Sequence, residues 1–198
     1  MELLAKLSRK IGDDLVQSNI VKAEDAEIYI YGINQILTSV FNVSSALIIG
    51  LILGTFFEVM VFMAAYIPLR IFAGGFHAKT PLRCYIFSLI MLIVVSIGMK
   101  YLLLSEWVYY AVLSAALLIV LAISPVEDKN KPLDEIEHKV YKKRALIIAA
   151  TELVISIIFR LAGLDKLFIA VVYSFTALGF MLILGAIKNA LKSKNKLD

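Results

Sequence analysis

The segment at residues 167–187 decides the fold class, because it reads LFIAVVYSFTALGFMLILGAI and contains no charged side chain. A helix needs about 20 apolar residues to cross the hydrocarbon core of a bilayer. Two more uncharged stretches, 36–57 and 85–99, are apolar nearly all round and not along a single stripe. The chain is 61% apolar and 18% charged, with a mean hydropathy of +0.86, well above a soluble domain. The sequence therefore predicts an all-α polytopic membrane protein.

Six membrane spans are predicted, at 36–54, 57–73, 85–104, 107–124, 145–162 and 166–187. A single membrane domain, 1–198, would then consist of an amphipathic arm (1–35), a six-helix bundle (36–187) with a polar loop at 125–144, and a basic tail (188–198). Of the 20 Lys and Arg residues, only Lys100, Arg160 and Lys166 fall on the side opposite the termini. Because cytoplasmic loops carry the excess of Lys and Arg, both termini are expected in the cytoplasm.

The arm before the first span has the pattern of an amphipathic helix, with Leu3, Leu7 and Ile11 opposite Lys6 and Arg9. Two placements fit this pattern equally well. The helix lies on the inner membrane surface as an interfacial helix, or it packs on the cytoplasmic ends of the bundle. The arm lacks an apolar core followed by small residues, so we expect it to be retained and not cleaved as a signal peptide.

The segment RIFAGGFHAKTPLRC, residues 70–84, contains the only cysteine, Cys84, and one of two histidines, His77. A cysteine nucleophile acts as a thiolate, and a nearby histidine serves as its base and partner. Thr80 and Pro81 are typical of an N-cap and a first helical position, so Cys84 is expected in the first turn of the third span. The positive end of the helix dipole favours a thiolate there. The alternative is an incidental pair, a small apolar cysteine and an interfacial histidine.

This segment resembles the signature of the accessory gene regulator B (AgrB) family, the membrane endopeptidases that mature quorum-sensing peptides in Gram-positive bacteria. The family pattern of an Arg, then Gly-Gly-x-His-Ala, then a Cys seven residues after the His is met by Arg70, Gly74, Gly75, His77, Ala78 and Cys84. A second block, SPVEDKNKPL at 124–133, resembles the Pro-and-Lys loop that follows the fourth span of the family. The size, span count and orientation agree as well, so the resemblance covers the whole chain.

The resemblance implies a cysteine endopeptidase at the cytoplasmic face of the cell membrane. His77 would activate Cys84 to cleave the C-terminal tail from an AgrD-like precursor peptide through a thioester. An internal Cys or Ser of the precursor would then close a thiolactone or lactone ring. The resemblance also implies a homodimer. No cofactor, metal or nucleic-acid partner is expected.

The acidic tails of such precursors match the cations Arg70, Lys79 and Arg83 of this acid-free segment. Gly75 would let a substrate strand come close, and Lys129 and Lys131 resemble family positions. These six residues are the candidate substrate-binding residues. Arg70 either holds a substrate carboxylate or extends to the lipid headgroups. For Lys129 and Lys131, binding to substrate and binding to lipid phosphate are both open.

Other polar residues have simpler interpretations. One face of the first span favours hydrogen bonding between helices, through Gln35, Thr38, Asn42 and Ser45. Glu152 lies inside the fifth span, with Arg70 or a cytoplasmic Lys as its candidate partner, and a structural role is favoured. His138 has charged neighbours, which is typical of a solvated helix face.

Two other functions remain open at this point, a small transporter or exporter and a scaffold without chemistry. The sequence shows no internal repeat of the kind that transporters have.

Overall fold

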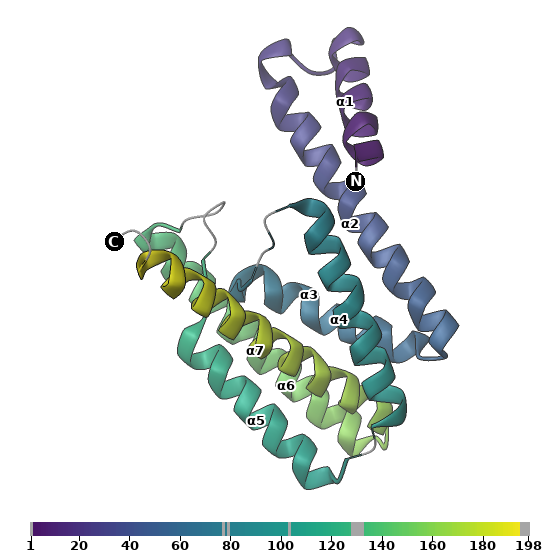
Figure 1. Cartoon of the computed structure of the whole chain (residues 1–198), viewed down its shortest axis with the longest axis vertical. Coiled ribbons are helices and arrows are strands. Elements are labelled where there is room, and N and C mark those ends of the chain that lie inside the picture. Colours follow the sequence, from purple (N-terminus) through teal and green to yellow (C-terminus); the bar gives the residue numbers. More distant parts are fainter. Residues whose placement is uncertain (1, 77, 79, 103, 128–132, 195–198) are drawn as a thin grey trace.

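The structure is a computed structural model of the chain, and it describes residues 2–76, 78, 80–102, 104–127 and 133–194. These residues form seven α-helices, a short 3₁₀ helix and no strand (Figure 1). The elements are α1 (Glu2–Gln17), η1 (Ala23–Asp25), α2 (Ala26–Leu53), α3 (Phe56–Ala73), α4 (Pro81–Tyr101), α5 (Glu106–Ile123), α6 (Glu135–Leu161) and α7 (Asp165–Lys194). The all-α polytopic fold is confirmed.

Five helices are long and apolar enough to cross a membrane. In the described part of the chain these are Ala23–Leu53, Phe56–Ala73, Pro81–Tyr101, Glu106–Ile123 and Asp165–Leu191. The helix α6 is not among them, since Arg144 and Arg160 bound its apolar part and Glu152 lies inside it. It nevertheless packs along α3 and α7. Five of the six predicted spans therefore have the required length and composition. The remaining one, the fifth span at 145–162 in α6, stays a prediction.

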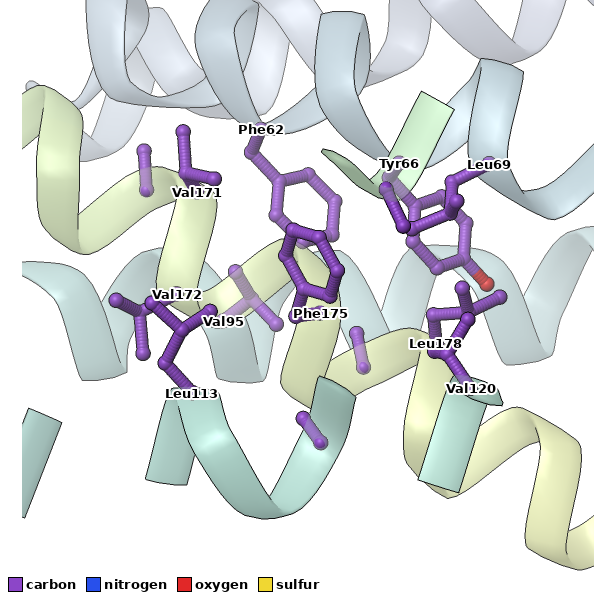
Figure 2. Packing of buried hydrophobic residues seen from close by; sticks show 14 of the residues in the cluster. Phe62, Tyr66, Leu69, Val95, Leu113, Val120, Val171, Val172, Phe175 and Leu178 are labelled. Atoms are coloured by element: carbon purple, nitrogen blue, oxygen red, sulfur yellow. The ribbon is translucent and has the colours of Figure 1, made fainter. Parts of the chain in front are cut away.

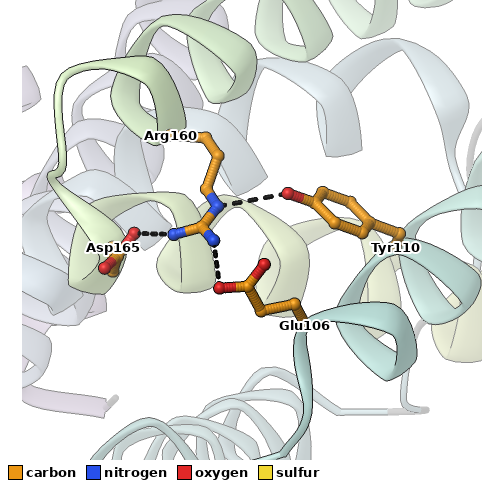
Figure 3. A network of polar contacts seen from close by, with 4 residues as sticks. All are labelled: Glu106, Tyr110, Arg160 and Asp165. Atoms are coloured by element: carbon orange, nitrogen blue, oxygen red, sulfur yellow. Dashed lines mark hydrogen bonds and ion pairs between the residues drawn. The ribbon is translucent and has the colours of Figure 1, made fainter.

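Polar contacts at one end of the bundle join helix ends that are far apart in the sequence. The Lys100 ammonium donates to the carbonyl of Leu53 over 2.6 Å, which links the last turns of α4 and α2. Another network joins the end of α6 to the starts of α5 and α7. In it the Arg160 guanidinium contacts Glu106, Asp165 and the Tyr110 hydroxyl (Figure 3). Lysines and arginines are few at this end, which we predict to be the outer one.

The helix α7 is the centre of the bundle. In its apolar stretch of 18 residues, 61% of the residues are buried within the protein, against 11% in the corresponding stretch of α2. Figure 2 shows Phe175 and Leu178 of α7 packed among Phe62 of α3 and Leu113 and Val120 of α5, all of them buried. Large apolar side chains on the outer faces of the other helices are exposed, as expected where lipid replaces protein.

The N-terminal helix α1 packs against the first half of α2, and the two form a hairpin that projects beyond the bundle (Figure 1). Its contact face is made by small residues, because Ser8 is buried and Gly12 approaches Ile30 closely. Leu3 and Leu7 remain exposed. Ile11, in the same stripe, is half-buried, so α2 covers the stripe only in part, and the placement of α1 on the membrane surface stays a prediction.

Three helices extend beyond the predicted spans. The helix that contains the first predicted span begins at Ala26 and not at residue 36, because the last ten residues of the predicted arm are helical and continuous with the span. The second half of the polar loop predicted at 125–144 is helical: α6 begins at Glu135, behind an N-cap in which Asp134 and Glu137 form a capping box. At the other terminus, α7 continues past residue 187 to Lys194.

Candidate functional site

The helix α3 ends in a turn of two glycines with positive φ, at 73° for Gly74 and 119° for Gly75. Residues with a β-carbon rarely adopt such angles. The Arg70 guanidinium, in the last turn of α3, donates hydrogen bonds to the carbonyl oxygens of Gly74 and Phe76. Arg70 therefore clamps the turn, a role that the sequence analysis did not anticipate. The binding of a substrate carboxylate by Arg70 stays a prediction.

The glycine turn pairs with the connection between α5 and α6. The N–H of Gly75 donates to the carbonyl of Val126 over 3.0 Å, and the N–H of Val126 donates to the carbonyl of Ala73 over 2.9 Å. These bonds form an isolated parallel bridge between Gly74 and Val126. The two sequence blocks that resemble the family signature, 70–84 and 124–133, therefore meet in space.

The same turn also packs directly against the backbone of α7. The N–H of Phe76 donates to the carbonyl of Met181 over 2.8 Å. A β-carbon added to Gly185 would lie 2.7 Å from the carbonyl carbon of Gly75 and 2.8 Å from the nitrogen of Phe76. Likewise, a β-carbon on Gly75 would lie 2.9 Å from the carbonyl oxygen of Met181. Only glycines allow this approach, and sequence reasoning missed Gly185 because its neighbour in space is far away in the chain.

Cys84 lies in the first turn of α4, as predicted. The helix begins at Pro81, and the hydroxyl of the N-cap residue Thr80 accepts the N–H of Arg83 over 3.3 Å. The Cys84 thiol is free and half-buried. It is therefore partly accessible at the N-terminal end of α4.

The chain beside the predicted catalytic histidine is anchored near Cys84. His77, Lys79, Lys129 and Lys131 lie outside the described residues, so the Cys84–His77 pair and the roles of these lysines stay predictions. The residue before His77, Phe76, packs its ring against Phe87 of α4 at 5.6 Å between centroids. Phe87 follows Cys84 by less than one helical turn. The segment therefore reaches α4 at the level of the cysteine.

Cations surround this end of the bundle. Arg83, predicted to bind substrate, is exposed beside Cys84. The Lys188 ammonium lies over the Phe76 ring at 5.2 Å, and the Arg144 guanidinium lies over the ring of Phe72 at 5.3 Å. In the sequence, Arg144 and Lys188 were noted only as part of the charge of the polar loop and of the basic tail, respectively. Their position just beyond span ends was the available signal.

A cavity of about 230 Å³ lies between α2, α3 and α4. Its walls include Asn42 and Ala46 of α2, Tyr66 of α3, and Tyr85 and Ser88 of α4. Tyr66 stacks on Phe62 with ring centroids 5.3 Å apart. Tyr85 follows Cys84 directly in α4, so the cavity begins one residue beyond the cysteine.

The remaining polar candidates have structural surroundings. Ser45 is within 3.1 Å of the Tyr85 hydroxyl, which is the hydrogen bond between helices that was favoured for this face. Glu152 is buried, and neither of its carboxylate oxygens has a hydrogen-bond partner in the described part of the chain. Arg70 is not its partner, because Arg70 holds the glycine turn. His138 lies in the first turn of α6 and is half-buried, while its neighbours Glu137 and Lys139 are exposed.

Comparison with known proteins gives consistent matches. The model of the family described as Accessory gene regulator B matches residues 6–187. An AgrB-like protein of Listeria monocytogenes is 27% identical over 145 residues, 71% of each chain. An AgrB-like protein of Clostridium perfringens is 28% identical over 167 residues, 80% of this chain and 76% of the relative. Protein FsrB of Enterococcus faecalis is 27% identical over 155 residues, 77% of this chain and 62% of the relative. No solved structure matches the chain.

The family match covers α2 to α6 in full and most of α1 and α7, and it includes both blocks that meet at the glycine turn. The chain belongs to the accessory gene regulator B family.

Proposed function

We propose that this protein is a membrane cysteine endopeptidase that cleaves the C-terminal tail from an AgrD-like precursor and promotes its cyclisation for quorum sensing. One observation carries the proposal: the only cysteine of the chain is free and half-buried at the start of α4. The turn in which both family blocks meet contacts the same helix through the rings of Phe76 and Phe87. Membership of the family supports the link to a peptide precursor.

The reaction needs a base, a nucleophile and an acceptor. His77 takes the thiol proton, and the Cys84 thiolate attacks the carbonyl carbon of the scissile bond. The C–N bond breaks, and the imidazolium returns its proton to the amine of the departing tail. A thiol or hydroxyl of the precursor then attacks the thioester, which closes the ring and releases the Cys84 thiol.

The turn that precedes His77 supplies rigidity. Arg70 and the Gly74–Val126 bridge hold the backbone on one side, and Met181 holds it on the other. Positioned groups lower the barrier because the reacting atoms need no further search for orientation. Restricted access of water at the membrane boundary would favour attack by the precursor over hydrolysis.

We also propose that the site faces the cytoplasm and that two copies of the chain form a homodimer. The excess of Lys and Arg at the Cys84 end supports the orientation. The homodimer is supported by the resemblance alone.

Co-expression with the AgrD-like precursor, followed by mass spectrometry of the released peptides, tests the proposal. Cys84→Ala, Cys84→Ser and His77→Ala should all lose cleavage, because a serine hydroxyl stays protonated without a full triad. His138→Ala is the matched control and should cleave normally. In the wild type, acid quenching should trap an adduct on Cys84 that hydroxylamine releases, as a thioester requires. Cleavage by both Cys84→Ala and His77→Ala at normal expression would end the peptidase proposal and favour a small exporter.

A further inference from the structure

We propose that the cavity between α2, α3 and α4 receives the side chain of the substrate residue whose carbonyl Cys84 attacks. By its size and walls it selects a large apolar or aromatic side chain at that position. The inference rests on the proposed function, since it assigns a specificity pocket to the same nucleophile.

The pocket lies within reach of an acyl group on Cys84. Tyr85, the next residue, lines the cavity, and so does Ser88, one turn further along the same helix face. One helical turn rises about 5.4 Å. A phenylalanine or leucine side chain is long enough to extend from an acylated sulfur to the level of Ser88. A shorter side chain such as that of alanine would leave the cavity empty.

The walls are suited to an apolar side chain. Beyond its few hydroxyl and amide groups, the lining is aliphatic, aromatic or thioether, as with Ala46, Phe62, Met63 and Leu92. A cavity of about 150 Å³ lined by apolar residues accepts benzene. The volume of about 230 Å³ is therefore sufficient for an aromatic ring.

Contacts hold the polar wall in place before any substrate arrives. The Tyr85 ring packs on Phe41 at 5.2 Å between centroids, and its hydroxyl is within 3.1 Å of the Ser45 hydroxyl. On the opposite wall, Tyr66 is stacked on Phe62 at an interplanar angle of 10°. A preformed pocket binds its side chain without first ordering its own walls, which favours selection.

A lipid acyl chain is the competing occupant, and the position of Tyr85 and Ser88, within one helical turn of Cys84 on α4, favours the substrate. A lipid site has no reason to be placed one residue from the only cysteine. The two occupants also predict different results. If the cavity is a substrate pocket, the rate at which Cys84 reacts must depend on the size of the side chain that the electrophile carries. Occupation by lipid would give no such dependence.

The test uses N-acetyl amino acid chloromethyl ketones of alanine, leucine and phenylalanine as probes on the full chain in detergent. The Cys84 thiolate displaces chloride and forms a carbon–sulfur bond, which intact-mass spectrometry measures. Each rate is divided by the rate with iodoacetamide, which has no side chain to place. In the wild type the phenylalanine probe should react about tenfold faster than the alanine probe, or more, given the free energy of burying a large side chain. Cys84→Ala should give no adduct.

Filling the cavity should abolish this preference. Ser88→Phe places a ring in the pocket, and the ratio of phenylalanine to alanine rates should fall to about one. Ile90→Phe is the matched control on the same helix, at an outward position that is 56% exposed, and should keep the wild-type ratio. Ala46→Leu fills the cavity from α2 and keeps the test valid if Ser88→Phe does not fold.

The two proposals fail in different ways. A wild-type ratio near one, or a ratio that survives both filling variants, overturns the pocket even where the precursor is cleaved. A high wild-type ratio that falls in the filling variants supports the pocket. The endopeptidase proposal then fails only if Cys84→Ala and His77→Ala both still cleave the precursor.

Discussion

Gly185→Ala is the sharpest test of how α7 supports the site. The added β-carbon would lie 2.7 Å from the carbonyl carbon of Gly75 and 2.8 Å from the nitrogen of Phe76. Both neighbours are backbone atoms, which cannot rotate away as a flexible side chain can. Ordinary contact begins at 3.4 Å, so the turn must move by about 0.7 Å. That shift also weakens the hydrogen bond from Phe76 to Met181.

The magnitude follows from two effects. Overpacking of a well-packed interior costs about 1–3 kcal/mol. A misplacement of about 1 Å in a catalytic arrangement can lower the rate by about 10²-fold, so a movement of 0.7 Å should lower cleavage by about tenfold or more. Alanine is also the better helix former by about 1 kcal/mol, which acts in the opposite direction on stability.

Gly179→Ala is the matched control, because it makes the same substitution in the same helix. Its β-carbon would be 3.7 Å from its nearest neighbours, which is ordinary contact. The difference between the two variants therefore isolates the collision with the turn. Both should be purified in detergent and compared by thermal unfolding and by cleavage of the co-expressed precursor. Equal cleavage by Gly185→Ala and Gly179→Ala at equal expression would refute the role assigned to this contact.

Three further predictions concern other parts of the molecule. Arg70→Ala should reduce cleavage of precursors with acidic and with neutralised tails, since Arg70 clamps the turn. If Arg70 also binds the tail, the loss measured by mass spectrometry should be larger for the acidic one, and unchanged cleavage of the neutralised precursor would contradict the clamp. Cysteines placed at Glu135 and Asp165 should be labelled from the cytoplasm and from outside, respectively, in intact cells, and the reverse pattern would invert the topology. Glu152→Gln should keep or raise the melting temperature and leave cleavage unchanged, because the carboxylate oxygens have no partner among the described residues; lost cleavage in a stable variant would give Glu152 a functional role.

The sequence predicted those features of the fold that depend only on residues close together in the chain. Thr80 and Pro81 mark the start of α4 because N-capping and a fixed φ depend only on adjacent residues. The long apolar stretches likewise predicted the helices of the bundle. The first predicted span starts at residue 36, ten residues after the start of α2 at Ala26. Hydropathy indicates where a chain enters the membrane, and a helix can begin well before that point.

Contacts between distant segments could not be predicted from one sequence. The position of Gly185 in an apolar run carries no sign that Gly75 lies against it. The cavity beside Cys84 is formed by three helices whose relative rotation depends on packing. The clamp by Arg70 was missed because a cation near a span end ordinarily faces headgroups or an anion.

The bonding of the glycine turn explains why an arginine and two glycines occur together in this segment. Irregular backbone at the edge of a membrane must find its hydrogen-bond partners within the protein. The N–H groups of Gly74, Gly75 and Phe76 bond to carbonyl oxygens of Arg70, Val126 and Met181. The Arg70 guanidinium satisfies the carbonyls of Gly74 and Phe76 in turn. Loss of activity on replacing Arg70 or the glycines therefore follows from geometry alone, and only His77 and Cys84 can distinguish chemistry from support.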